Sequence, residues 1–66
     1  MYAVTREKEV IESMEVVVYG IRYADTYTVH NVSTDKSAVE NLVNDFNKYN
    51  LDPIHLYDAV EDFLEQ

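Results

Sequence analysis

The segment Asn50-Leu51-Asp52-Pro53 constrains the fold of this chain more than any other, because it ends one helix and starts another. Asparagine tolerates the left-handed backbone that often follows a helix, so Asn50 is the expected C′ residue. Aspartate is a good N-cap, and proline suits the first helical position. Leu51 then lies beside both helix ends, as C″ of one and N′ of the other. The segment predicts two helices joined by a tight turn.

Apolar residues recur at helical spacing on both sides of this junction. A first helix is expected over residues 35–49, with an apolar stripe of Val39, Leu42, Val43, Phe46 and Tyr49. A second is expected over residues 53–65, with a stripe of Leu56, Val60, Phe63 and Leu64, and with Tyr57 and Ala59 at its edges. Ser33 or Thr34 is the expected N-cap of the first helix, which places Asp35 in the first turn.

The first half of the chain alternates between apolar and polar residues, as strands do. Residues 15–23 place Val17, Tyr19, Ile21 and Tyr23 on one face, and Val16, Val18 and Arg22 on the other. Residues 26–32 are the next strand, with Tyr27 and Val29 on one face. Residues 15–32 are therefore predicted to form a β-hairpin around the turn Ala24-Asp25. Residues 1–12 have a weaker strand pattern that becomes charged, which fits either an edge strand or an arm.

These patterns predict an α+β fold, in which a two- or three-stranded antiparallel sheet is followed by a two-helix hairpin packed on one face. The 66 residues fit a single domain. A chain this short buries little apolar surface, and without cysteine it has no disulfide to stabilise it, so a homodimer is one expectation. Gly20 interrupts the best strand, which indicates a bulge or the close passage of a helix.

The charge of the chain limits its partners. Thirteen acidic residues against five basic ones give a formal net charge of −8. Nucleic acids and anionic membranes recruit Lys and Arg, so neither is an expected partner. A basic protein surface is an expected partner, although acidity also serves simply to keep a small protein soluble. The absence of cysteine and of a signal peptide indicates the cytoplasm.

Carboxylates gather where they oppose the dipole of the last helix. Asp58 lies near the middle of this helix, Glu61, Asp62 and Glu65 lie in its last turns, and no Lys or Arg occurs from Asp52 onward. Each negative charge near a helix C-terminus costs about 0.3–1 kcal/mol. Since local rules tend to fail at functional sites, these four acids are the candidate partner-binding residues. The alternative is a solvated helix end that binds nothing.

No catalytic, cofactor-binding or metal site follows from the sequence. His55, Asp58 and Asp62 share one helical face, but a single face cannot complete the shell of a metal ion. His30 is expected on the open sheet face with no nucleophile beside it. A single glycine cannot build a phosphate-binding loop.

Several runs resemble a family of short Gram-positive bacterial proteins classed as a domain of unknown function. They are Val18-Tyr19-Gly20-Ile21, Ser33-Thr34-Asp35, Leu42-Val43, Phe46-Asn47, Pro53-Ile54-His55-Leu56 and Asp58-Ala59-Val60-Glu61-Asp62-Phe63-Leu64. The resemblance spans roughly residues 16–65, and implies a small bacterial cytoplasmic protein without supplying an activity or a site residue.

Three functions remain open. The first is a non-enzymatic interaction or regulatory module that uses the acidic helix, and it predicts an apolar patch with an acidic rim. The second is an acidic mimic of nucleic acid that occupies a DNA-binding protein, and it predicts carboxylates in regular double rows. The third is a metal-dependent or hydrolytic enzyme, which needs His30, His55 and carboxylates in one cleft and ranks last because a small chain can hardly spare such a cleft.

Overall fold

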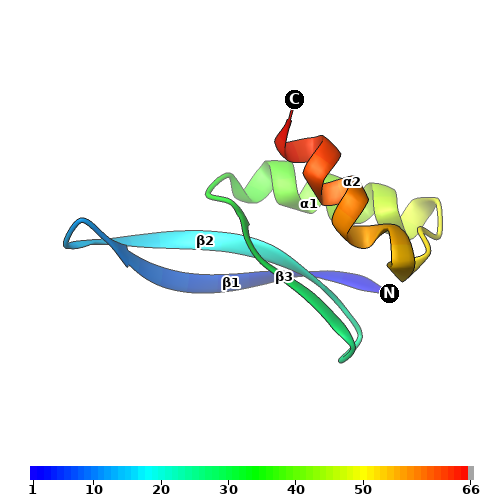
Figure 1. The fold of residues 1–66 in the computed structure, drawn as a ribbon, viewed down its shortest axis with the longest axis horizontal. Helices are drawn as coiled ribbons and strands as arrows, with labels where there is room; N and C mark the ends of the chain where they lie inside the picture. The colour runs from blue at the N-terminus through cyan, green and yellow to red at the C-terminus, as the bar shows by residue number, and fades with distance from the viewer. Residues whose placement is uncertain (66) are drawn as a thin grey trace.

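A computed structural model describes residues 1–65 of the chain as a three-stranded sheet followed by two helices (Figure 1). The elements are β1 (Tyr2–Ile11), β2 (Met14–Tyr23), β3 (Tyr27–Ser33), α1 (Lys36–Lys48), the 3₁₀ turn η1 (Pro53–His55) and α2 (Leu56–Leu64). The strands are antiparallel in the order β1-β2-β3. The predicted α+β fold is confirmed. Residues 2–11 form an edge strand, which decides between the two alternatives for the N-terminal segment.

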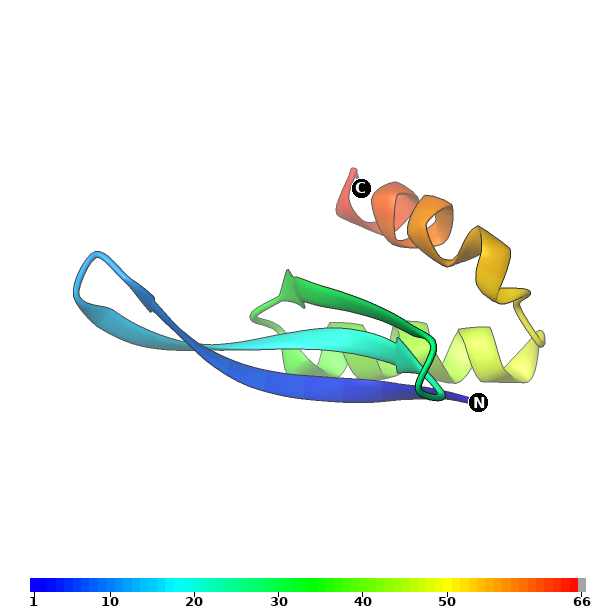
Figure 2. The same cartoon turned by 60° about the horizontal axis from the view of Figure 1, so that its bottom comes forward.

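The hairpin of β1 and β2 is the longest feature of the molecule and extends well beyond the helices (Figures 1 and 2). Ile11 pairs with Met14 across a two-residue turn. Both turn residues have positive φ, 52° at Glu12 and 67° at Ser13. Such a turn matches the twist of the flanking strands, although asparagine and glycine usually occupy it. Its end is exposed and partly apolar, with Val10 72% and Met14 68% exposed.

The third strand pairs with only half of β2. The pairing runs from Tyr23↔Tyr27 to Tyr19↔Ser33 and is interrupted by a bulge between Tyr19 and Ile21. Gly20 lies at the bulge, where an added Cβ would be 2.3 Å from the carbonyl oxygen of Val29. The predicted bulge is confirmed, but the β3 backbone makes the close approach to Gly20, and the expectation of a helix there is wrong.

The core lies between the helices and the sheet face that carries Tyr2, Val4, Ile21 and Val29. Its buried members are Tyr2, Ile21, Val32, Val39, Val43, Phe46, Leu56 and Val60. Two residues of the predicted stripes lie outside it, since Tyr49 is 71% and Leu64 58% exposed. Tyr49 is the C-cap residue of α1, where the helical backbone has ended. Leu64 is the last residue of α2 and lies to one side of the face that carries Leu56 and Val60.

The junction between the helices has the predicted geometry. Asn50 has φ 51°, and the Leu51 N–H donates to the Phe46 carbonyl at 3.0 Å in a Schellman arrangement. The Asp52 side chain accepts from the Ile54 N–H, but a 3₁₀ turn precedes α2. At the other end of α1 the prediction is wrong, because Asp35 is the N-cap and accepts from the Ala38 N–H. Ser33 instead accepts from the Asp35 N–H.

Candidate functional site

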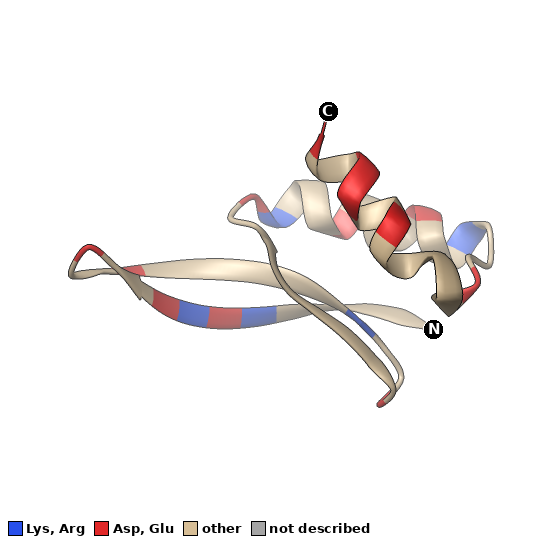
Figure 3. Ribbon diagram, viewed as in Figure 1, with Lys and Arg blue, Asp and Glu red and all other residues tan. Residues whose placement is uncertain are grey.

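The four predicted acidic residues lie exposed on α2 and at its C-cap, and this helix carries no basic side chain (Figure 3). α2 is short, nine residues, and packs through Leu56 and Val60, which turns the opposite side to solvent. Glu65 follows it as the C-cap residue. The structure thus places Asp58, Glu61, Asp62 and Glu65 where a partner can reach them.

Apolar side chains lie among these carboxylates. Tyr57 is 56% exposed and Leu64 58% exposed. Glu61 follows Tyr57 by four residues and precedes Leu64 by three, so the three side chains form one row along the helix. Asp58 and Glu65, seven residues apart, form the adjacent row. We call these five residues, Tyr57, Asp58, Glu61, Leu64 and Glu65, the α2 outer face. The sequence pattern did not predict that Tyr57 and Leu64 are exposed, because their positions lie beside the buried stripe of the helix.

Asp62 belongs to a different surface. It lines a shallow groove of about 350 Å³ between the two helices, together with Ala59 and Phe63 of α2. The α1 side of this groove comprises Ala38, Asn41, Leu42 and Asp45. Two carboxylates, of Asp45 and Asp62, therefore border an apolar floor. The structure groups three of the four predicted acids on the α2 outer face and assigns the fourth to the groove.

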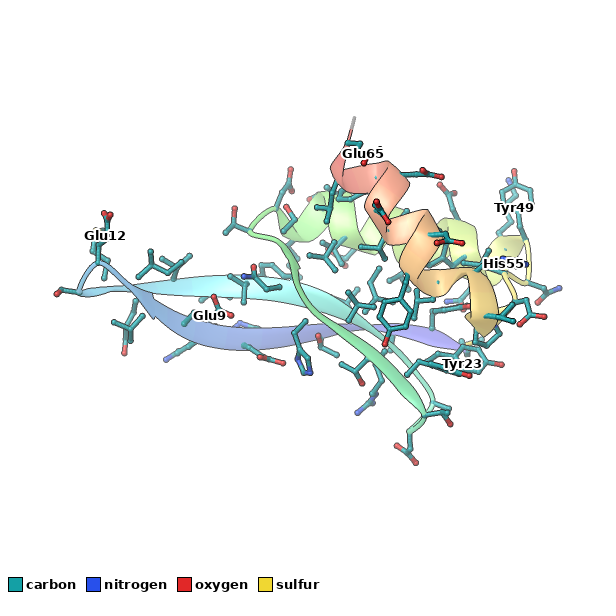
Figure 4. All side chains as sticks on the ribbon, viewed as in Figure 1. Glu9, Glu12, Tyr23, Tyr49, His55 and Glu65 are labelled. Atoms are coloured by element: carbon teal, nitrogen blue, oxygen red, sulfur yellow. The ribbon has the colours of Figure 1, made fainter. Side chains whose placement is uncertain are left out.

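The two histidines lie apart in the fold. His55 ends η1, where its backbone N–H donates to the Asp52 carbonyl at 2.9 Å (Figure 4). His30 is on the sheet face away from the core, with Nδ1 2.5 Å from the Glu7 carboxylate. Neither histidine lines the helix groove or the hollow beside the N-terminus. Over residues 1–65, no three ligating side chains lie close enough to hold a metal ion.

The contacts of His30 explain why Val18 is buried. Strand alternation places Val18 on the sheet face away from the core, yet it is 2% exposed. The bulged backbone of β3 directs His30 toward Glu7 and Asn31 toward Glu9, and the Asn31 amide donates to the Glu9 carboxylate at 3.3 Å. Since Glu7 pairs with Val18 and Glu9 with Val16, these contacts bridge the strand that carries both valines. Val18 is therefore not available to form an apolar surface on this face.

A second hollow, of about 310 Å³, lies where β1 begins, and Tyr2 and Asn47 in its lining are bonded to each other. The backbone of Tyr2 exchanges two hydrogen bonds with the Asn47 side chain, and the Tyr2 hydroxyl donates to the Leu51 carbonyl at 2.7 Å. Burial raises the pKa of the Tyr2 hydroxyl, and the charges of Tyr23 and Asp52 raise it further. These contacts tie the edge strand to α1, which is a structural role.

Comparison with known proteins supplies a family. A family model described as a family of unknown function, DUF6514, matches residues 1–66. The chain belongs to the DUF6514 family. This membership confirms the expected uncharacterised domain, whereas the Gram-positive origin of this DUF6514 chain stays a prediction. The comparisons with curated proteins and with solved structures give no match. In the described part of the chain, no helix is long and apolar enough to cross a membrane.

Proposed function

We propose that this chain is a non-enzymatic cytoplasmic interaction module whose α2 outer face binds a basic, amphipathic segment of another protein. One observation carries the proposal: Tyr57 and Leu64 are more than half exposed, in one row with the carboxylate of Glu61 and beside the row of Asp58 and Glu65. An apolar patch with an acidic rim is the arrangement expected of an adaptor.

The chemistry of the α2 outer face suits a segment rich in lysine or arginine. The aliphatic stems of these residues cover apolar surface while their charged ends reach outward to carboxylates. Tyrosine is enriched among the residues that contribute most to binding, because it is large, rigid and amphipathic. Carboxylates at the rim speed association and reject acidic partners. Tyr57 is accordingly the proposed anchor, and the acids provide selectivity.

Nucleic-acid mimicry has less support. In β1, acids and bases alternate as Arg6, Glu7, Lys8 and Glu9, and α1 mixes both signs (Figure 3). Only α2 is uniformly acidic, and its nine residues are about 13 Å long at 1.5 Å per residue. The described surface therefore offers a short acidic face rather than extended double rows of carboxylates. The enzyme alternative requires both histidines in one cleft, and the structure separates them.

The test uses isotope-labelled protein and a synthetic helical peptide of alternating lysine and leucine rows. We expect amide shifts to concentrate on the α2 outer face, and to vanish in Asp58→Lys/Glu61→Lys/Glu65→Lys and in Tyr57→Ala. The matched control is Glu12→Lys/Asp25→Lys/Glu40→Lys, which changes net charge equally at exposed sites elsewhere. If both triple variants lost binding equally, or if the amide shifts spread over the whole surface, binding would depend on net charge alone. Either result would refute the proposal.

A further inference from the structure

The half of β2 that β3 leaves unpaired is the strongest feature not used by the proposed function. β3 pairs with β2 only from Tyr19 onward. Residues Met14–Val18 therefore have β1 on one side and no strand on the other, and no backbone hydrogen bond in the described chain satisfies that side by another route. Figures 1 and 2 show this part of the hairpin projecting free of the helices. We call it the open β2 edge.

The register decides which backbone groups face outward. In a two-residue hairpin, the residues that flank the turn form a hydrogen-bonded pair, here Ile11 and Met14. Hydrogen-bonded and non-hydrogen-bonded positions alternate along an antiparallel strand. Val16 and Val18 therefore direct their backbone groups to β1. Glu15 and Val17 direct theirs to the open β2 edge, which leaves two N–H donors and two carbonyl acceptors for another strand.

We propose that the open β2 edge pairs with the same edge of a second copy, in an antiparallel two-fold arrangement centred on Val16. In this register Glu15 lies opposite the partner copy's Val17, and Val17 opposite its Glu15. Both residues direct their backbone groups outward, so the two pairs supply four hydrogen bonds. Val16 lies opposite its own copy, and Met14 opposite Val18. The four strands then form one continuous sheet across the two-fold axis.

Charge and hydrogen bonding favour this register on the open β2 edge. Two strands related by a two-fold axis normal to the sheet always place one residue opposite itself. A centre at Val16 puts valine beside valine, a favourable β-branched pair, whereas a centre at Glu15 puts two carboxylates together. A centre at Val17 also pairs valine with valine, but it puts Glu15 opposite Tyr19, which already pairs with Ser33, so only two hydrogen bonds form. On the outer edge of β1, any centre from Arg6 to Glu9 puts like charges opposite each other. Charges of this kind are how proteins protect edges from pairing.

The occupant is a second copy rather than an unrelated strand because the open β2 edge complements itself. Its only charged residue, Glu15, lies opposite valine in the symmetric register. The edge is also β-branched through Val16, Val17 and Val18, and such apolar strands aggregate when their edges stay open. Closing the two edges against each other pairs the outward backbone groups of Glu15 and Val17 in both copies. The α2 outer face takes no part in the contact, so each copy keeps it.

The experiment uses charge pairs at Val16, which is half-buried. Light scattering after size exclusion, from about 10 µM to about 1 mM because so small an interface binds weakly, is expected to approach twice the 7.7 kDa of one chain. Val16→Lys alone and Val16→Glu alone are each expected to stay monomeric, since both place like charges across the axis. An equimolar mixture of the two is expected to recover the dimer mass.

Two further measurements keep the outcome decisive. Val10→Lys is the matched control: it changes an exposed apolar residue of the same hairpin, on β1, and is expected to leave the dimer intact. In the unmodified chain, the amides of Glu15 and Val17 are expected to exchange more slowly with solvent as concentration rises. A monomer at the highest concentration overturns the proposal. So does a dimer that Val10→Lys disrupts and the Val16 variants spare, because the apolar hairpin tip would then be the interface.

Discussion

The side-chain amide of Asn47 holds the backbone of Tyr2 as a neighbouring strand would. The Tyr2 N–H donates to Asn47 Oδ1 at 2.7 Å, and Asn47 Nδ2 donates to the Tyr2 carbonyl at 3.0 Å. The two residues are 45 positions apart in sequence. This pair joins the outer edge of β1 to α1, and it satisfies the first backbone groups of an edge strand that would otherwise face water or another chain.

We expect Asn47→Ala to destabilise the fold by about 1–3 kcal/mol, because it leaves the partly buried backbone groups of Tyr2 without partners. Urea unfolding measures the loss. Asn44→Ala, at an exposed position of the same helix, is the control and should change stability by less than about 0.5 kcal/mol. Equal effects of the two substitutions would show that the amide contributes only helix propensity.

The hydroxyl of Tyr2 predicts an alkaline limit to stability. Its pKa is raised above the ordinary value of 10.0, first by burial and then by Tyr23 and Asp52. The folded chain therefore keeps this proton at a pH where the unfolded chain has released it. The stabilisation is complete below about pH 10 and is lost as the pH rises further, toward the raised pKa.

Denaturant unfolding between neutral pH and the alkaline range tests this prediction. Tyr2→Phe should be less stable than the original chain near pH 7, by about 0.5–1.5 kcal/mol, because the bond to the Leu51 carbonyl is lost. The difference between the two proteins should shrink above pH 10. A constant difference across this range would mean that the Tyr2 hydroxyl has its ordinary pKa in the folded chain.

The helical half could be predicted because its signals are local. Asn50, Leu51, Asp52 and Pro53 act within a few residues of one another, and the structure reproduces their roles in ending α1 and starting the next helix. The exposure of the α2 acids followed from helical spacing in the same way. The N-cap of α1 is Asp35 and not the predicted Ser33 or Thr34. All three consecutive residues are suitable caps, and only the path of the backbone selects one of them.

The sheet half depended on contacts that no local pattern records. The turn at Glu12 and Ser13 lacks the glycine or asparagine that marks a hairpin, so residues 1–12 could not be joined to β2 from sequence. Val18 is buried although it alternates onto the outer face, because a bulge in β3 carries His30 and Asn31 toward β1. Tyr2, the most buried of the tyrosines, was missed because its partners come from the other end of the chain.

The N-cap of α1 can be tested by comparing the loss of stability when Asp35 or its neighbour Thr34 is replaced by alanine. The Asp35 carboxylate accepts a hydrogen bond from the Ala38 N–H at 3.2 Å. Removing an N-cap side chain costs typically about 1 kcal/mol, so Asp35→Ala should destabilise the fold by that amount. Thr34→Ala, at the exposed residue before it, should cost less than about 0.5 kcal/mol. Thermal unfolding distinguishes the two, and the reverse order would restore Thr34 as the cap.

The close approach of the β3 backbone to Gly20 predicts that a methyl group at this position is disruptive. An added Cβ at position 20 would lie 2.3 Å from the Val29 carbonyl oxygen and 2.7 Å from the Thr5 hydroxyl. The hydroxyl can rotate away, but the carbonyl belongs to the β3 backbone and moves only if the bulge opens. Gly20→Ala should therefore cost about 2–4 kcal/mol, as overpacking of a fixed backbone does.

Thr5→Ala alone should be close to neutral, because the Thr5 hydroxyl is buried without a hydrogen-bond partner. If the carbonyl is the obstacle, the double variant should recover only a small part of the loss in urea unfolding. Full recovery would instead identify the Thr5 side chain as the only barrier to a larger residue at position 20.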